Sequence, residues 1–228
     1  MVLAVSGHVE AERVKRAAGR LFGALPAAGA PIPSSPYAAA ARFDRRVVEC
    51  PAQQAQVLVG YLGPSLTEPD YAPLRVLGTV LGGGMSGRLF SELRDRRGLA
   101  YSVGMLGTYR TGPSFLISYM GTAPRNAAAA EAGVLEEIER IRTAPVSERE
   151  LARAKAYLLG NLAMDRRTSA RHAWYMAFFE VTAGGWDFPE RSARAVEAAT
   201  SGDVARVARQ YLARPTVVVV QPPRVEGR

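Results

Sequence analysis

The stretch LGGGMSGRLFSELRDRRGLAYSV, which runs from Leu81 to Val103, decides the fold of this chain. A run of glycines is followed by a helical pattern with one apolar stripe, made by Leu89, Phe90 and Leu93. Ser86 is placed to accept a hydrogen bond from an amide in the first turn. Gly98 stands where a helix commonly ends in a left-handed residue. The stretch therefore predicts a helix that begins near Ser86 and ends at Gly98.

A strand is expected directly after that helix. From Leu99 to Met105, larger residues alternate with small ones, which is the two-residue period of a strand. Because the chain reverses at a glycine, Arg94 and Tyr101 are expected at the same end of the sheet. A charged guanidinium and a phenol placed there can hold a peptide backbone or a developing oxyanion. The alternative is that Arg94 is an ordinary solvated arginine at a helix end, where Glu92 and Arg96 form an i,i+4 pair.

The same stretch resembles the second-half signature of the pitrilysin/insulinase family of zinc metallopeptidases, of the mitochondrial-processing-peptidase type. In that family a zinc-bearing half and a structurally similar second half close around the substrate. The resemblance implies that Tyr101 hydrogen-bonds the scissile carbonyl as it becomes tetrahedral and that Arg94 holds an adjacent substrate carbonyl. It also implies that the glycine segment lies near the substrate chamber and takes part in substrate binding, through Gly82, Gly83 and Gly84.

Zinc is expected outside this chain. The two histidines, His8 and His172, are far apart in sequence, and neither belongs to HxxEH, the motif that sets two zinc ligands and a catalytic Glu on one helix. By resemblance, the zinc comes from a complementary half, in cis or as a separate subunit, and this chain alone is expected not to hydrolyse peptides. Some relatives are catalytically dead core subunits of larger assemblies, so a scaffold role is the alternative function.

The net charge of +8 raises a third possibility, an arginine-rich nucleic-acid-binding domain. The arginines are spread over expected helix faces and do not form a run with interleaved aromatic residues. They include Arg13, Arg140, Arg153, Arg194, Arg206 and Arg209. Solvated helix faces are the favoured interpretation, and no nucleic-acid partner is expected.

A phosphate-binding loop is also excluded. In GGGMSGRL the required Lys-Ser/Thr pair is replaced by Arg88 and Leu89, and a helix precedes the glycines where a strand is needed. The glycines are instead interpreted as a flexible joint between two helices.

Composition limits the remaining classes. No run of about eighteen apolar residues is present, so no membrane span is expected. The first residues, MVLAVSGHVEAE, do not resemble a signal peptide, and cytoplasm is the default expectation for the compartment. The single cysteine, Cys50, excludes an intrachain disulfide and is interpreted as a small buried hydrophobe.

The chain divides into four parts. Residues 1–24 are expected to be a strand–helix remnant of a preceding domain, with Val2–Ser6 as a buried strand. Residues 25–41 are rich in Pro, Ala and Ser and are expected to be a linker. Residues 42–223 form the processing-peptidase-like domain, and residues 224–228 are a tail.

The order of elements in the main domain predicts its fold class. Strands are expected at residues 45–50, 55–62, 99–105, 115–120 and 216–220, and helices at 69–81, 124–143, 147–183 (with a break near 165–168), 188–198 and 201–212. Grouped hairpins and helices indicate an α+β fold with a mostly antiparallel sheet covered by helices on one face. The family resemblance implies the same half-shell, with an extended peptide substrate paired along a sheet edge and a possible homo-oligomer.

Overall fold

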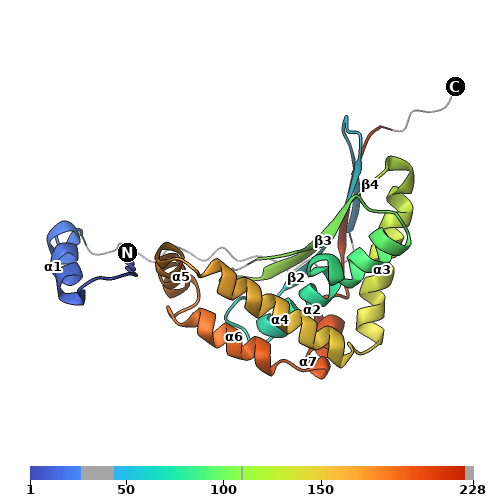
Figure 1. Cartoon of the computed structure of the whole chain (residues 1–228). Helices are drawn as coiled ribbons and strands as arrows, with labels where there is room; N and C mark the ends of the chain where they lie inside the picture. Colours follow the sequence, from blue (N-terminus) through green and yellow to red (C-terminus); the bar gives the residue numbers. More distant parts are fainter. Residues whose placement is uncertain (27–43, 109, 224–228) are drawn as a thin grey trace.

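The computed structural model describes residues 1–26, 44–108 and 110–223. In these residues, one five-stranded sheet forms the frame of the main domain, with the strands in the order β1-β5-β2-β4-β3 (Figure 1). The strands are β1 (Asp44–Glu49), β2 (Ala55–Gly63), β3 (Ser102–Gly107), β4 (Ser114–Thr122) and β5 (Thr216–Gln221). The five strands expected in the main domain are all present, although β3 begins three residues later than its sequence pattern indicated.

The sheet is mostly antiparallel, as predicted. β4 pairs antiparallel with β2 and β3, and β5 pairs antiparallel with β2 but parallel with β1. The β-branched run that forms β5 therefore occupies an interior position, between β1 and β2. Val217 and Val219 are buried on the side of the core. Cys50, expected to be buried, is only partly so, because it lies just beyond the end of β1.

Helices cover one face of the sheet (Figure 1). They are α2 (Tyr71–Gly82), α3 (Ala127–Thr143), α4 (Glu148–Asp165), α6 (Phe188–Ala198) and α7 (Ser201–Tyr211). A further helix, α5 (Ser169–Thr182), packs against α6 at the end of this layer. On β2, alternate residues such as Val57 and Val59 are fully buried against this layer. The α+β architecture with helices on one face is confirmed.

Local capping explains where two of these helices begin. Ser147 and Glu150 form the predicted capping box, with the Ser147 hydroxyl accepting from the Glu150 amide. The predicted break near residues 165–168 is confirmed, because α4 ends at Asp165 and Thr168 caps a new helix, α5.

The opposite face of the sheet carries no helix among the described residues. Leu58, Phe115, Ile117 and Val218 line a groove of about 650 Å³ on that face, next to the end of α7. Alternate residues of β2, β4 and β5 therefore form a partly exposed apolar surface there.

The structure of the N-terminal residues differs from the one that their sequence predicts. α1 (Ala11–Phe22) forms as expected, but it has no buried residue. Val2–Ser6 is not a buried strand: it pairs with none of the strands described above, and the Val2, Leu3 and Val5 side chains are exposed. A single extended segment cannot satisfy its backbone in a ladder or bury alternate side chains without a neighbouring strand. Nearly all of the expected linker, residues 25–41, lies outside the described residues, as does the tail, 224–228.

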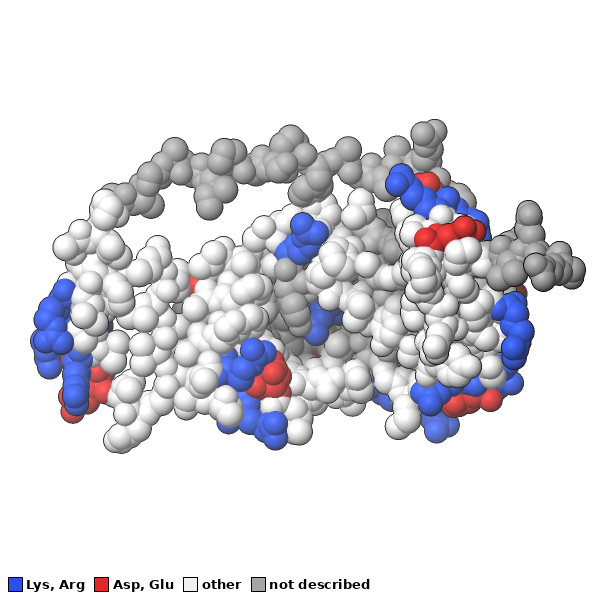
Figure 2. Space-filling model, turned by 90° about the horizontal axis from the view of Figure 1, so that it is seen from above, with Lys and Arg blue, Asp and Glu red and all other residues white. Residues whose placement is uncertain are grey.

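Charged side chains do not merge into one basic surface on the face seen in Figure 2. Lys and Arg lie there in several separated groups, some of them beside Asp or Glu. In the described ranges no helix has both the length and the apolar character that crossing a membrane requires.

Candidate functional site

The helix that carries Arg94 is wound more loosely than predicted. After Arg88 and Leu89, η2 (Phe90–Arg96) is a π-helix, in which the Arg97 amide donates to the Glu92 carbonyl at 3.1 Å. Ser86 is not its N-cap, because this residue belongs to the short turn η1 (Gly84–Ser86) and makes no capping bond. Single π-helical turns are rare and occur frequently at functional sites.

The corner that joins η2 to β3 is held by backbone hydrogen bonds. Gly98 has φ +62° and ends the helix, as predicted. The Leu99 amide then donates to the Leu93 carbonyl at 2.8 Å, and the Leu99 carbonyl accepts from the Thr122 hydroxyl at 2.5 Å. The Tyr101 amide donates to the Gly121 carbonyl at 2.9 Å. These bonds fix the backbone on both sides of the corner, which we call the η2–β3 corner (residues 94–101).

The two predicted site residues project from this corner into solvent. The Tyr101 side chain is 63% exposed, and Arg94 is exposed, with its guanidinium 4.7 Å from the centre of the Phe90 ring. Within the described part of the chain, neither side chain makes a hydrogen bond or an ion pair. A phenol and a guanidinium on a fixed backbone, without competing partners, can donate hydrogen bonds to carbonyl oxygens of a bound chain.

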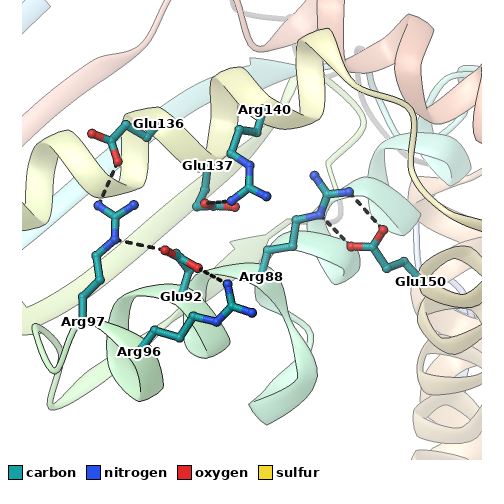
Figure 3. A network of polar contacts seen from close by, with 8 residues as sticks. All are labelled: Arg88, Glu92, Arg96, Arg97, Glu136, Glu137, Arg140 and Glu150. Carbon is teal, nitrogen blue, oxygen red and sulfur yellow. Dashed lines mark hydrogen bonds and ion pairs between the residues drawn. The ribbon is translucent and has the colours of Figure 1, made fainter.

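Ion pairs anchor both ends of the segment that carries Arg94 (Figure 3). At the start, Arg88 makes a two-pronged contact with Glu150 of α4, with Nε–Oε1 at 2.7 Å and Nη2–Oε2 at 3.1 Å. Hydrogen bonding to the Arg88 guanidinium lowers the pKa of Glu150 to about 2, and the Ser147 hydroxyl and amide contribute. The glycine segment is thereby tied to the first turn of α4.

At the other end, Arg97 bridges Glu92 and Glu136 of α3, at 3.2 and 2.8 Å (Figure 3). The predicted Glu92–Arg96 pair also forms, at 3.1 Å. Hydrogen bonds from Arg97, and then from Arg96, lower the pKa of Glu92. The loosely wound helix is therefore held against α3 at its last turn.

Glu150→Gln is expected to lower the free energy of unfolding by about 1–3 kcal/mol near neutral pH, because a charge-assisted pair with Arg88 is lost. The folded-state pKa of Glu150 is depressed from 4.5 to about 2. The stabilisation is therefore complete above the ordinary pKa and disappears as pH falls from 4.5 towards 2. Urea unfolding of both proteins near pH 7 and near pH 3 measures the difference.

Glu148→Gln provides the matched control, since Glu148 is exposed in the same helical turn. Its effect should stay within about 0.5 kcal/mol at both pH values. A Glu150→Gln difference that is equally large at both pH values would show that the Glu150 charge is not what stabilises the fold.

The glycine segment has structural reasons for its composition. A Cβ on Gly82 would lie 2.5 Å from the Met105 amide nitrogen, because the end of α2 packs directly on β3. A Cβ on Gly83 would collide with the Thr79 carbonyl, and Gly84 has φ +69° and lies beside the Tyr157 ring. Close packing and backbone conformation therefore require these glycines, whereas their substrate-binding role stays a prediction.

Gly82→Ala is expected to destabilise the fold by about 1–3 kcal/mol, because the added methyl meets backbone that cannot move without disturbing β3. Denaturant unfolding at fixed pH measures the change. Gly160→Ala is the control: apart from its chain neighbours and the backbone of its own helix, no atom lies within 4 Å of the new methyl, and the change is expected to be neutral or to stabilise α4 by about 0.5–1 kcal/mol. Equal stabilities for both variants would contradict the packing explanation.

The residues present do not fit a zinc ion. Within the described ranges, no three or more His, Cys, Asp or Glu side chains are grouped so that they could hold a metal. His8 precedes α1 and His172 lies in α5, and these are the two histidines of the chain. No step of a reaction is therefore assigned to a metal bound by this chain.

The family model and the related proteins point to the same family. Residues 1–158 match the family described as the peptidase M16 inactive domain. A protein of Mycobacterium bovis named as an uncharacterized zinc protease is 29% identical over 218 residues, which cover 94% of this chain and 50% of that protein. The chain thus spans about half the length of the curated relatives it matches.

Solved structures share the fold. A protease from Helicobacter pylori superimposes with a TM-score of 0.84 at 22% identity, covering 95% of this chain and 54% of that chain. A peptidase M16 inactive domain from Pseudomonas fluorescens superimposes with a TM-score of 0.80 at 20% identity, covering 97% and 54%. At these identities the likeness concerns the fold alone.

Proposed function

This chain belongs to the peptidase M16 family as its C-terminal, inactive domain, and on that premise we propose that it is the substrate-binding half of a zinc-dependent peptidase. Its relatives are named zinc proteases, and they are about twice as long as the stretch they share with it. The proposed substrates are peptides or unfolded polypeptides, which bind in an extended conformation. The zinc, its water and the general-base Glu belong to a complementary half, in cis or as a separate subunit.

One observation carries the proposal: the η2–β3 corner presents Arg94 and Tyr101 to solvent on a fixed backbone, without hydrogen-bond or ion-pair partners among the described residues. The Tyr101 hydroxyl donates a hydrogen bond to the scissile carbonyl oxygen, and this bond strengthens as negative charge develops on that oxygen. Arg94 donates to a neighbouring substrate carbonyl and fixes the register of the peptide. Because the corner is already ordered, little reorganisation is needed when substrate binds.

Exposed apolar residues near the N-terminus support the proposal that this chain functions together with a complementary half. Val2, Leu3 and Val5 are exposed in a segment without regular secondary structure, and α1 is amphipathic in sequence but has no buried residue. We infer that residues 1–24 complete the sheet and helix layer of the complementary half. In that setting Val2–Ser6 pairs with a strand, as its sequence pattern predicts.

Arg94→Gln tests the proposal in the assembled peptidase. It is expected to raise KM for an extended peptide by roughly 10-fold, because a charged hydrogen bond to the substrate is lost, while kcat changes less. Arg96→Gln is the matched control, since Arg96 lies on the same helix, is exposed and pairs only locally with Glu92. Steady-state kinetics with a fluorogenic peptide gives both constants.

Equal kinetics for the two arginine variants would remove the role of Arg94 and favour the scaffold alternative. In that case the chain assembles with a partner but its corner does not contact substrate. If the zinc-bearing half has full peptidase activity without this chain, the result supports the scaffold role.

A further inference from the structure

Both tryptophans of the chain project from one end of the helix layer. They are Trp174 of α5 and Trp186 of the loop after it, and their side chains are 46% and 61% exposed. Val181, in the last turn of α5, is 68% exposed. Tryptophan is on average largely buried in folded chains, and it is enriched where proteins bind one another. This end of the helix layer is therefore a candidate interaction surface.

Buried aromatic residues hold α5 in the fold. Tyr175 and Phe179 lie in a buried cluster with Phe188 of α6, and the ring centres of Phe179 and Phe188 are 4.6 Å apart. With 3.6 residues per turn, Trp174 and Val181 lie on a different part of the helix circumference, away from this cluster. Their exposed side chains are therefore presented by a helix that is already packed.

The N-terminal segment runs beside α5 (Figure 1). A cavity of about 410 Å³ lies between the two, lined by residues 2–5, Met176, Glu180 and Trp186. At the other end of the helix, a Cβ on Gly7 would lie 3.9 Å from the Ser169 hydroxyl oxygen. The segment therefore follows the helix from its last turn to its first. We call the exposed side of this region, formed by Trp174, Met176, Val181 and Trp186, the α5 surface.

The chemistry of the α5 surface indicates what kind of partner fits it. The four side chains that form it are uncharged and mostly apolar. Two charged side chains beside it already have partners: Arg171 pairs with Asp165, and the Glu180 carboxylate accepts the Trp186 amide at 2.8 Å. Burial of aromatic and aliphatic side chains favours a partner that is apolar at the contact. A folded polypeptide surface has that character, whereas a nucleic-acid backbone does not.

We propose that the α5 surface is where the complementary half docks on this chain. This inference rests on the proposed function, in which Val2–Ser6 pairs with a strand of that half. Neighbouring strands lie about 4.8 Å apart, so a strand paired with this segment is brought to the edge of the α5 surface. The curated relatives are about twice as long as the stretch they share with this chain, which leaves room for a partner of similar size. Docking buries both tryptophans.

The two tryptophans allow docking to be observed directly. The sequence holds two tryptophans, so the chain labelled with 5-fluorotryptophan gives one fluorine resonance for Trp174 and one for Trp186. Addition of the unlabelled HxxEH-bearing half, as a separate polypeptide, is expected to shift both resonances. Unshifted resonances in a mixture that sediments as a complex would overturn the inference. Shifts that appear when the labelled chain alone is concentrated would place a second copy on the α5 surface and overturn it too.

Val181→Arg is expected to weaken association of the two halves roughly 30-fold, because docking would bury an unpaired charge. The fold should tolerate it, since Val181 is exposed in the last turn of α5, where a cation is favourable. Met85→Arg makes the same change at a side chain that is 77% exposed on η1, and it is expected to associate as the wild type does. Isothermal titration calorimetry measures the affinities.

Trp186→Ala tests the same contact by removing a side chain. Its loss of affinity is expected to be roughly 30-fold, the effect of truncating an aromatic residue at the centre of an interface. Tyr157→Ala is the control, because it truncates another exposed aromatic residue, on α4. Thermal unfolding of all variants verifies that they fold.

Peptide turnover by the mixed halves separates this inference from the proposed function. Val181→Arg is expected to lower turnover when this chain is scarce and to reach the kcat of the wild type when it is in excess, whereas Tyr101→Phe lowers kcat at every concentration. If Val181→Arg and Trp186→Ala associate as tightly as their controls in a mixture that cleaves peptide, the inference is overturned and the proposed function stands. If the two halves neither associate nor cleave, the proposed function fails and the inference fails with it.

Discussion

Replacing Tyr101 by Phe is expected to lower kcat of the assembled peptidase about 10²–10³-fold, with KM nearly unchanged. The substitution removes one oxygen from a side chain that is 63% exposed and has no hydrogen-bond partner among the described residues. The fold therefore loses no contact that stabilises it. The hydrogen bond to the oxyanion forms in full only in the transition state, so the loss falls on the chemical step. Single-turnover hydrolysis of a fluorogenic peptide measures it.

Tyr157→Phe serves as the control for this experiment. Tyr157 is an exposed tyrosine of α4, and its ring lies beside Gly84. The control is expected to retain the kcat of the wild type, and both variants should unfold at the wild-type temperature. A Tyr101→Phe enzyme that turns over as fast as Tyr157→Phe would remove the oxyanion role.

Leu93→Ala is expected to lower the free energy of unfolding by about 2–5 kcal/mol. Leu93 is fully buried and is the residue by which η2 enters the core. Its side chain lies so close to α3 that a Cβ on Gly133 would be 2.6 Å from it. Removing it leaves a cavity under the corner that carries Arg94 and Tyr101. Urea unfolding measures the stability.

Leu106→Ala makes the same chemical change on β3 at a side chain that is 54% exposed. Its cost is expected to stay below about 1 kcal/mol, since little apolar surface leaves the core. If Leu93→Ala costs no more than this control, the corner is not anchored in the way the packing indicates.

Local sequence patterns predicted most of the fold, because interactions between residues close in sequence determine the elements concerned. The β-branched run of β5, the capping box at Ser147 and the left-handed stop at Gly98 each depend on residues close in sequence. The helix–strand corner was predicted for the same reason. Its π-helical winding was not predicted, and the residues that anchor the segment, Glu136 and Glu150, lie on other elements.

Contacts between distant segments escaped the sequence analysis. The Arg88–Glu150 pair joins residues 62 positions apart, and no periodicity signals such a pairing.

The N-terminal residues show the opposite case, in which a strand-like sequence pattern forms no strand among the described residues. Val2–Ser6 has strand-forming composition, yet a strand is stable only with a neighbour to pair with. Among the described residues, no strand is placed beside it. The inferred complementary half would supply that neighbour.

The most direct test of the account is peptide hydrolysis by three samples: this chain, the HxxEH-bearing half, and the two together. The account predicts zinc-dependent turnover by the two together, none by this chain alone, and a loss of about 10²–10³-fold when the mixture contains Tyr101→Phe. Undiminished turnover by the HxxEH-bearing half without this chain would contradict it.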